Sequence, residues 1–383
     1  MHKLRIAICS HSTNPRGGVV HALALGDALV RLGHQAVVHA PDVNGSGFFR
    51  SSLCQTVAIP ASAAGNVPEL VAKRRAEYGQ YFSRDGNRDF DVFHAQDSIS
   101  ANALADLKRD GKISRFARTV HHVDRFDEPV LTMLQARGIA SADRHFVVSR
   151  QWQLHLDRHF GIQAEIVANG VDTQIFSAKA DASDAQLRGL LRLGGGPILL
   201  AIGGIEERKN SLRILQAFAR LRGQYENAQL IVVGGASLLD HSDYQRAFHG
   251  ALSARKLPEN SIIITGPLPQ VLMPALYRAA DMLVFPSTKE GFGLAVLEAM
   301  ASGIPAVTSS IAPFTEYLKA QDAAWCDPYD VASIAAAMRQ ALEPLARQNL
   351  VRRGLTIAAR HDWRQVAVAH LTAYAALREP EHA

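Results

Sequence analysis

The sequence predicts an α/β protein of two domains, each a doubly wound parallel sheet covered by helices on both faces. Short runs rich in Val, Ile and Leu alternate with longer segments of helical periodicity, as is typical of strands buried on both faces. This alternation occurs twice, and a polar stretch with a glycine-rich end separates the two series. A chain of 383 residues is also long enough for two domains of ordinary size.

The first series predicts six strands and the helix that follows the first of them. Residues 19–33, VVHALALGDALVRLG, have apolar side chains at helical spacing and predict this helix. The predicted strands are the apolar runs at 4–9, 35–40, 91–95, 118–122, 144–149 and 164–169.

The second series predicts five strands and is followed by one more helix. Its strands are the runs at 197–203, 229–235, 261–266, 281–287 and 305–309. The polar stretch between the series places the boundary near residues 170–195, so we expect domains at 1–175 and 176–361. The last segment, 362–383, predicts an amphipathic helix that crosses back to the first domain.

Composition narrows the classes of partner and compartment. The net charge of +5 is small and evenly spread, so the sequence has no basic nucleic-acid arm and no nucleic acid is expected as a partner. Cys9, Cys54 and Cys326 lie far apart, without the spacing of a disulfide framework or a zinc site, which favours a reducing cytoplasm. No apolar run is long enough for a membrane helix, so we expect at most peripheral contact with the inner membrane face.

Two glycine turns precede helices in positions that suit anions. Gly17 and Gly18 follow the first strand, where helix amides and the helix dipole attract a phosphate. A tight turn without a ligand is an equal alternative, and the missing G-x-G-x-x-G and Walker lysine weaken dehydrogenase and P-loop interpretations. In GGIEERKNS, Arg208 and Lys209 suit a diphosphate, whereas a solvated charged turn is the alternative.

The segment at 288–310, TKEGFGLAVLEAMASGIPAVTSS, carries the sharpest signal. Glu290 lies in a strand-to-helix loop, and Glu298 lies about two turns into the next helix, so both carboxylates can face one cleft. Gly291 and Gly293 permit close approach of the backbone to a ligand. Carboxylates that accept several hydrogen bonds suit a hydroxyl-rich partner. The alternative is a helix-terminal Glu290 and an exposed Glu298.

These segments resemble the retaining glycosyltransferases of family 4 (group 1), which have the GT-B fold of two Rossmann-like domains. EGFGLAVLEAMASGIPAVTSS resembles the donor-site motif of the family, and GGIEERKNSLRILQAFARL resembles its phosphate-binding segment. The resemblance extends in order over nearly the whole chain. It includes PRGGVVHALALGDALVRLGHQAVVHAP, NGVDTQIF and LYRAADMLVFPS.

The resemblance implies a role for each matched residue. Glu298 would bind the ribose hydroxyls, and Glu290 would bind hydroxyls of the transferred sugar near C3 and C4. Arg208 and Lys209 would neutralise the diphosphate leaving group. The Gly17 and Gly18 amides would reach the same phosphates from the first domain. The remaining donor-binding residues implied by the family are Gly234, Gly235, Gly266 and Leu268 at the nucleobase, and the Gly291, Phe292 and Gly293 loop.

Two further assignments follow from the resemblance. His121 matches the family histidine beside the reactive face of the sugar, and His122 is the competing assignment. Many members of the family have an arginine at the position of Gly204, and Arg208 beside Lys209 would take that role here, as in members with an RKN sequence.

The resemblance implies a hexosyltransferase-type enzyme that moves a sugar from a nucleotide diphosphate to an unidentified acceptor hydroxyl. The domain at 1–175 would face the acceptor, and the domain at 176–361 would bind the donor. The anomeric configuration would be retained by front-side displacement, with no cofactor and no metal. A nucleotide-sugar epimerase, a sugar phosphorylase and a non-catalytic nucleotide-sugar binding protein remain alternatives, and a dehydrogenase is a weaker one.

Three other signals have more ordinary explanations. Asp89 and Asp91 form a D-x-D, but at the start of a predicted strand, where metal binding is not expected. His155 and His159 share a helical spacing but lack the intervening glutamate of zinc proteases. Residues 73–75, Lys-Arg-Arg, are a candidate contact for an anionic acceptor or lipid headgroups, although a solvated helix face is favoured.

Overall fold

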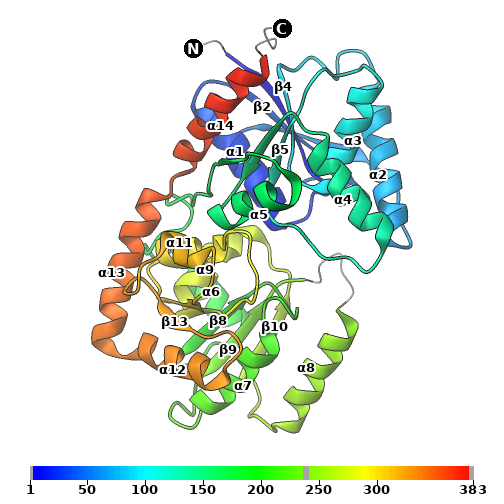
Figure 1. Ribbon diagram of the computed structural model, residues 1–383. Coiled ribbons are helices and arrows are strands. Elements are labelled where there is room, and N and C mark those ends of the chain that lie inside the picture. The colour runs from blue at the N-terminus through cyan, green and yellow to red at the C-terminus, as the bar shows by residue number, and fades with distance from the viewer. Residues whose placement is uncertain (1–2, 236–240, 379–383) are drawn as a thin grey trace. The chain divides into compact units, whose positions relative to one another are not determined.

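The computed structural model describes residues 3–235 and 241–378, and it has two compact units (Figure 1). The first unit comprises Met1–Asn169 and Trp363–Ala383, and the second comprises Gly170–Asp362. The boundary expected at 175/176 therefore lies inside the second unit, because the segment from Gly170 already groups with it. Val171 donates a backbone hydrogen bond to the His361 carbonyl, which joins the two ends of the second unit.

The first unit contains a seven-stranded parallel sheet in the order β3-β2-β1-β4-β5-β6-β7. Because β2 lies on one side of β1 and β4 on the other, the strand order reverses between β1 and β4, where such sheets bind ligands. The strands are β1 Arg5–Cys9, β2 Gln35–Asp42, β3 Gln55–Pro60, β4 Val92–Ala95, β5 Ala117–Val120, β6 Arg144–Val147 and β7 Glu165–Ile166.

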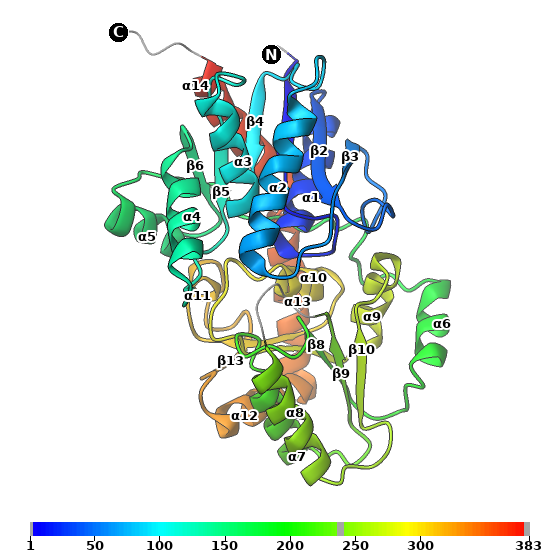
Figure 2. The same cartoon turned by 90° about the vertical axis from the view of Figure 1, so that its right-hand side faces the viewer.

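Helices cover both faces of this sheet. Helix α14 lies beside α1, whereas α2, α3 and α4 pack side by side elsewhere on the sheet (Figures 1 and 2). The expected terminal helix thus belongs to the first unit, and residues 379–383 of that expected segment lie outside the described residues. The helices are α1 Gly17–Arg31, α2 Val67–Phe82, α3 Ser98–Arg109, α4 Pro129–Ala140, α5 Arg150–Phe160 and α14 Trp363–Arg378.

The second unit repeats the architecture with six parallel strands in the order β10-β9-β8-β11-β12-β13. The order reverses between β8 and β11, which pair directly. The strands are β8 Ile198–Ile202, β9 Gln229–Val233, β10 Ile262–Gly266, β11 Met282–Phe285, β12 Ala306–Ser309 and β13 Ala324–Cys326. The helices are α6 Ala182–Leu190, α7 Ser211–Leu221, α8 Ser242–Ala254, α9 Met273–Ala279, α10 Leu294–Ala301, α11 Phe314–Tyr317, α12 Val331–Leu342 and α13 Pro344–Arg360, with a 3₁₀ turn at Gln270–Leu272.

The differences between expected and observed strands have two causes. The central strands β9 and β11 are buried along their whole length, which makes them continuous apolar runs in the sequence. Strand β3 is mostly exposed and β13 has only three residues, so neither forms an apolar run that can be recognised in the sequence. The expected strands at 197–203 and 229–235 end early because Gly203 and Gly234 turn the chain with positive φ.

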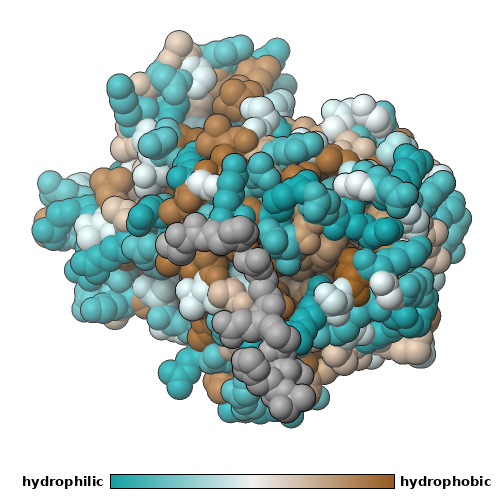
Figure 3. Space-filling model, turned by 90° about the horizontal axis from the view of Figure 1, so that it is seen from above, coloured by the Kyte–Doolittle hydropathy of each residue, from teal (hydrophilic) through white to brown (hydrophobic). Residues whose placement is uncertain are grey.

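The outer face seen in Figure 3 shows hydrophobic residues interspersed among hydrophilic ones. Within 3–235 and 241–378, none of the helices combines the length and the apolar character that crossing a membrane would require.

Candidate functional site

A basic turn follows β8 in the second unit. Gly203 and Gly204 have φ of 119° and 77°, values that favour glycine. A Cβ built on Gly203 would lie 2.6 Å from Cε of Lys209, so the lysine stem lies directly over this glycine. The side chain of Lys209 is 14% exposed, and its ammonium lies 4.3 Å from the centre of the Phe285 ring. The turn therefore buries a cation.

An acidic loop follows β11 and meets this turn. Oε1 of Glu290 accepts hydrogen bonds from Nζ of Lys209 at 2.7 Å and from Nη1 of Arg208 at 2.9 Å. Glu290 is 7% exposed. Since β8 and β11 are neighbours across the reversal of strand order, their carboxyl-terminal loops lie side by side. The topology thus joins residues that are 81 and 82 positions apart.

Asn210 holds the two loops together. Its amide nitrogen donates to the carbonyl of Pro286 at 2.9 Å and to that of Pro328 at 2.6 Å. It is fully buried and has a φ of 63°, which Asn adopts more readily than most residues. Thr288 also donates a backbone hydrogen bond to the Arg208 carbonyl at 3.0 Å. Sequence reasoning missed Asn210, although an Asn just before a predicted helix was a usable signal.

The charges of this cluster compensate one another. Burial alone would raise the pKa of Glu290, but the charges of Lys209 and Arg208 outweigh it and hold the pKa below its usual value. Burial, with the nearby charge of Arg208, lowers the pKa of Lys209 to about 8 despite the attraction of Glu290. Glu206 lies 3.6 Å from Arg208 and adds a second carboxylate. Two cations are therefore held by two carboxylates.

Glu298 has a different environment. It lies on α10, and its Oε2 accepts a hydrogen bond of 2.7 Å from the hydroxyl of Tyr277 on α9, a residue that sequence reasoning missed. Burial raises the pKa of Glu298 to about 7, although the Tyr277 hydrogen bond acts in the opposite direction. Its protonation state therefore changes near neutral pH.

Glycines bring the turns after β8, β9 and β10 together. A Cβ on Gly234 would lie 2.6 Å from the Gly204 nitrogen, and the Gly234 nitrogen donates to the Gly266 carbonyl at 3.1 Å. A Cβ on Gly235 would lie 2.9 Å from Pro267, and Leu268 in the same turn is half-buried. The residues expected at a nucleobase thus form one layer of backbone.

Gly204 and Gly293 show why side chains are excluded from these turns. Gly204, which stands where many family members carry arginine, has a φ of 77°, and a Cβ there would lie 3.0 Å from the Gly235 carbonyl oxygen. Gly293 has a φ of 97°, and a Cβ there would lie 2.4 Å from the Phe314 ring. In this chain the backbone at both positions has the conformation that favours glycine.

The ring of Phe292 packs under the glutamate loop. It is 5% exposed and stacks on Tyr317, with a centroid distance of 4.8 Å and an interplanar angle of 3°. The donor contact predicted for Phe292 would therefore be made by its backbone.

In the first unit, the sequence-predicted residues meet where the strand order reverses. Gly17 and Gly18 are the first residues of α1, whose amino end has no side-chain cap. Neither has a positive φ, so a strained turn is not the reason for glycine at these positions. A Cβ on Gly18 would lie 3.7 Å from Cδ2 of His121 and 3.8 Å from the Gln96 carbonyl oxygen. The amino end of α1 therefore lies against His121.

The structure distinguishes the two adjacent histidines. His121 is half-buried, and its Nε2 lies 3.0 Å from Oε1 of Gln96. Burial lowers the pKa of His121 well below the usual value, and His21 makes the largest of the electrostatic contributions in the same direction. His122 is exposed and pairs with Asp124 at 3.1 Å. His121 is thus the histidine next to the glycine turn.

The discounted signals have structural partners. Oδ2 of Asp91 accepts from the backbone nitrogen of Arg5, and Asp89 pairs with the Arg5 side chain. The rings of His155 and His159 lie 4.4 Å apart on α5. Among the residues that the structure describes, no three His, Cys, Asp or Glu side chains are arranged so that they could hold a metal ion. The basic patch at 73–75 is used in ion pairs, namely Lys73 with Glu69, Arg74 with Glu77 and Arg75 with Asp106.

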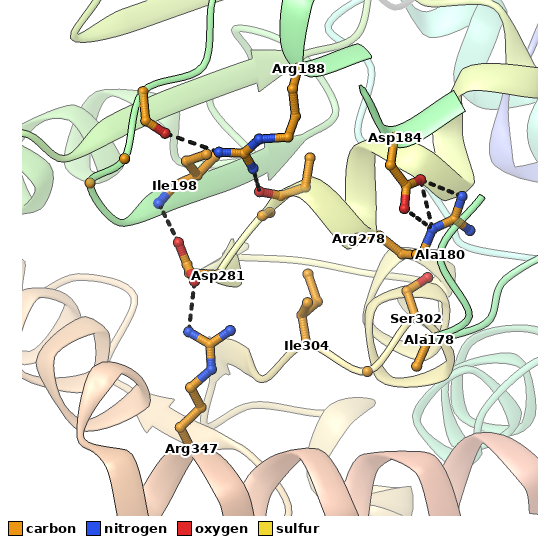
Figure 4. Close-up of a pocket in the computed structure, with 16 residues that line it drawn as sticks. Ala178, Ala180, Asp184, Arg188, Ile198, Arg278, Asp281, Ser302, Ile304 and Arg347 are labelled. Carbon is orange, nitrogen blue, oxygen red and sulfur yellow. Dashed lines mark hydrogen bonds and ion pairs between the residues drawn. The ribbon is translucent and has the colours of Figure 1, made fainter. Parts of the chain in front are cut away.

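A cavity of about 460 Å³ lies at the opposite, amino-terminal end of the second sheet (Figure 4). Arg347 pairs with Asp281 at 2.8 Å, and Asp281 also accepts from the Ile198 nitrogen at 2.8 Å. Arg278 forms a forked pair with Asp184. Asp281 and Arg347 thus fix the starts of β8 and β11, and the Arg278–Asp184 pair joins α9 to α6. Ligands of such sheets bind at the other end.

Two family models match the chain, one in each half. The model of glycosyl transferases group 1 matches residues 182–354, and that of Glycosyltransferase Family 4 matches residues 15–175. A glycogen synthase of Mycobacterium tuberculosis is 34% identical over 48% of this chain and 43% of its own length. An Escherichia coli O-antigen chain mannosyltransferase B is 33% identical over 46% of this chain. The chain thus spans less than half of these two relatives, at 43% and 45% of their lengths.

Longer matches have lower identity. A phosphatidyl-myo-inositol mannosyltransferase of M. tuberculosis is 27% identical over 96% of this chain and 95% of its own length. A sucrose-phosphate synthase from Thermosynechococcus elongatus superimposes with a TM-score of 0.80 over 97% of this chain and 99% of its own, at 20% identity. Anabaena HepE in complex with UDP-glucose superimposes with a TM-score of 0.75 over 97% of this chain and 100% of its own, at 18% identity. The two family matches and the shared architecture show that the chain belongs to the group 1, family 4 glycosyltransferases and has the GT-B fold.

Proposed function

We propose that the chain transfers a sugar from a nucleotide diphosphate to an acceptor hydroxyl, with retention of the anomeric configuration. The observation that carries this proposal is the buried cluster of Glu290, Lys209 and Arg208 at the carboxyl ends of β8 and β11. Family membership supports the reaction class, and the UDP-glucose complex of a fold neighbour supports this class of donor.

The proposed roles follow from the chemistry of the second unit. Arg208 and Lys209 suit the diphosphate, because cationic donors stabilise the charge that grows on the leaving group. Glu290, held by both cations, accepts hydroxyls of the transferred sugar. Glu298 accepts the ribose hydroxyls, and the turns at Gly234, Gly266 and Leu268 contact the base. In this scheme the diphosphate shares the two cations with Glu290.

The first unit supplies the remaining assignments. The amides of Gly17 and Gly18 suit an anion, and His121 contacts the transferred sugar. Because its pKa lies well below the usual value, His121 is neutral at pH 7 and positions the sugar by hydrogen bonding. The proton of the acceptor passes to the departing phosphate, so the route needs no protein base and no metal. The acceptor, which the sequence leaves open, is assigned to this unit.

A thermal-shift screen with UDP-glucose, GDP-mannose and ADP-glucose tests the donor site. A ligand that binds only the folded state raises the melting temperature, so one of these compounds should stabilise the wild type. Lys209→Met and Glu298→Gln should each abolish the shift. The matched controls Lys319→Met and Glu259→Gln change exposed residues outside the site and should keep it. A shift retained in both site variants would refute the assignment.

The stereochemistry can be tested without knowing the acceptor. Slow hydrolysis of an α-linked donor such as UDP-glucose should first release the α-anomer, which ¹H NMR detects before mutarotation. Release of the β-anomer first would contradict retention. A changed sugar still attached to the nucleotide would favour an epimerase, and binding without any turnover when acceptors are supplied would favour a binding protein.

A further inference from the structure

Beneath His121, the first unit contains a cluster of four histidines from four different segments. The ring of His21 on α1 lies 4.8 Å from that of His121 and 5.8 Å from that of His370 on α14. His94 on β4 lies 5.5 Å from His370. His21, His94 and His370 are fully buried. The proposed function uses only His121 of this four-histidine cluster.

We propose that Gln96 is a positioning residue that holds His121 as the Nε2–H tautomer, so that Nδ1 is the hydrogen-bond acceptor offered to a hydroxyl of the transferred sugar. The part that concerns the sugar rests on the proposed function. The part that concerns the tautomer rests only on contacts within the first unit.

The ring of His94 is fixed from two sides. Nδ1 of His94 is 2.7 Å from the hydroxyl of Tyr374, and Nε2 is 2.9 Å from Oγ1 of Thr119. Tyr374 and Thr119 are fully buried, so neither contact competes with water. Since both nitrogens have partners, the ring cannot turn without losing a buried hydrogen bond.

The fixed ring orients the side-chain amide of Gln96. Nε2 of Gln96 is 3.4 Å from each of the two His94 nitrogens. It is therefore not directed at either nitrogen in the plane of the ring, and it approaches the face of the ring. The face of an aromatic ring is electron-rich and attracts N–H rather than a carbonyl oxygen. The amide nitrogen therefore points to His94, and the amide oxygen points away from it.

The orientation of this amide decides the tautomer of His121. Oε1 of Gln96 is 3.0 Å from Nε2 of His121, and an amide oxygen can only accept. Nε2 must then carry the proton, and in the neutral ring Nδ1 holds the lone pair. Gln96 is 1% exposed, so water cannot replace it at this contact.

The groups around His121 keep its ring neutral. Besides burial, four groups disfavour a proton on His121, namely His21 on α1, His122 on the same loop, Arg118 on β5 and His370 on α14. Asp124 pairs with His122 at 3.1 Å. A neutral ring with a fixed tautomer is what a hydrogen-bond acceptor for a hydroxyl requires.

Long-range ¹H–¹⁵N NMR of the full chain labelled with ¹⁵N-histidine tests the proposal, with His121→Asn used to assign the signals. In the wild type at pH 7, His121 should show a protonated Nε2 and an unprotonated Nδ1. In Gln96→Met, the two nitrogen shifts should move towards each other, because nothing then selects one tautomer. The matched control Gln135→Met removes a buried glutamine that contacts Asp124 instead, and it should leave both shifts unchanged.

The outcomes separate the two proposals. A protonated Nδ1 or an imidazolium in the wild type at pH 7 would overturn the tautomer assignment without any variant, as would identical His121 shifts in Gln96→Met. Addition of UDP-glucose, GDP-mannose or ADP-glucose should shift Nδ1 of His121 and leave Nε2 bound to Gln96. Failure of all three to bind would count against the proposed donor site and leave the tautomer result standing.

Discussion

The two units have the same strand order around the reversal but differ in electrostatics. In the second unit, the reversal between β8 and β11 brings together two cations and two carboxylates. In the first unit, neutral His121 and the Gln96 amide lie beside the reversal between β1 and β4, together with one carboxylate, Asp97, which pairs with His11 and caps α3. The shared fold therefore determines where a site can lie, and the side chains at that place determine which kind of group it can bind.

The largest expected effect is a difference in how the units respond to acid. Burial lowers the pKa of His21 to about 4 and that of His370 to about 3. Between these values and 6.5 the unfolded chain binds more protons, so the stability of the first unit should fall as the pH drops. At pH 5 each of these histidines should lower the free energy of unfolding by about 2 kcal/mol.

The second unit should respond in the opposite direction over part of this range. The pKa of Glu298 is raised from 4.5 to about 7, so its folded form binds more protons, and this group adds stability as the pH falls from 7 to 4.5. Hydrogen exchange by mass spectrometry at pH 7 and pH 5, corrected for the intrinsic rate, should show protection lost first from β1, β4 and β5. An equal loss of protection in β8 and β11 would show that the two units do not differ in their response to acid.

The second prediction concerns the buried ion pairs. Glu290→Ala leaves Lys209 and Arg208 side by side without their shared carboxylate, which should lower the free energy of unfolding by about 3 kcal/mol. Adding Lys209→Met should recover part of this loss, because the buried cation is then removed. Urea unfolding measures both variants, and a double variant as unstable as the sum of the single variants would show that the two residues are not coupled.

The third prediction is that donor binding releases protons below pH 7 and takes them up near pH 8. Below pH 7, Glu298 must lose a proton to accept ribose hydroxyls, so binding of UDP-glucose should release protons. Near pH 8, Lys209 is partly deprotonated and an added diphosphate raises its pKa, so binding should take protons up. Calorimetry in two buffers of different ionisation enthalpy measures both. His121→Asn should keep the release, because the group that loses the proton is Glu298, and loss of the release in His121→Asn would contradict the assignment.

The smallest expected effect comes from Tyr277→Phe. Its hydroxyl stabilises the carboxylate of Glu298 by a hydrogen bond, so its removal should raise the pKa of Glu298 further. The pH at which proton release ends should then move up, by less than about one unit for a single hydrogen bond. An unchanged linkage curve would show that Glu298 is not the group that releases the proton.

Much of the fold was predictable because central parallel strands are buried on both faces. Strands such as β9 and β11 leave continuous apolar runs, and the glycine turns, Arg208, Lys209, Glu290 and Glu298 follow such runs directly. The order of these motifs along the chain was enough to identify the family. Edge strands β3 and β13 were missed because exposure and shortness remove that signal.

The sequence by itself determined the alternation of strands and helices, the glycine turns and the kinds of charged group beside them, because these are local properties of the chain. Only the tertiary structure decided which groups meet. The contact of Gln96 with His121 spans 25 positions, and that of Asn210 with Pro286 spans 76. Burial, pKa and tautomer depend on such distant partners, since a side chain acquires them only when the strand order places its neighbours around it.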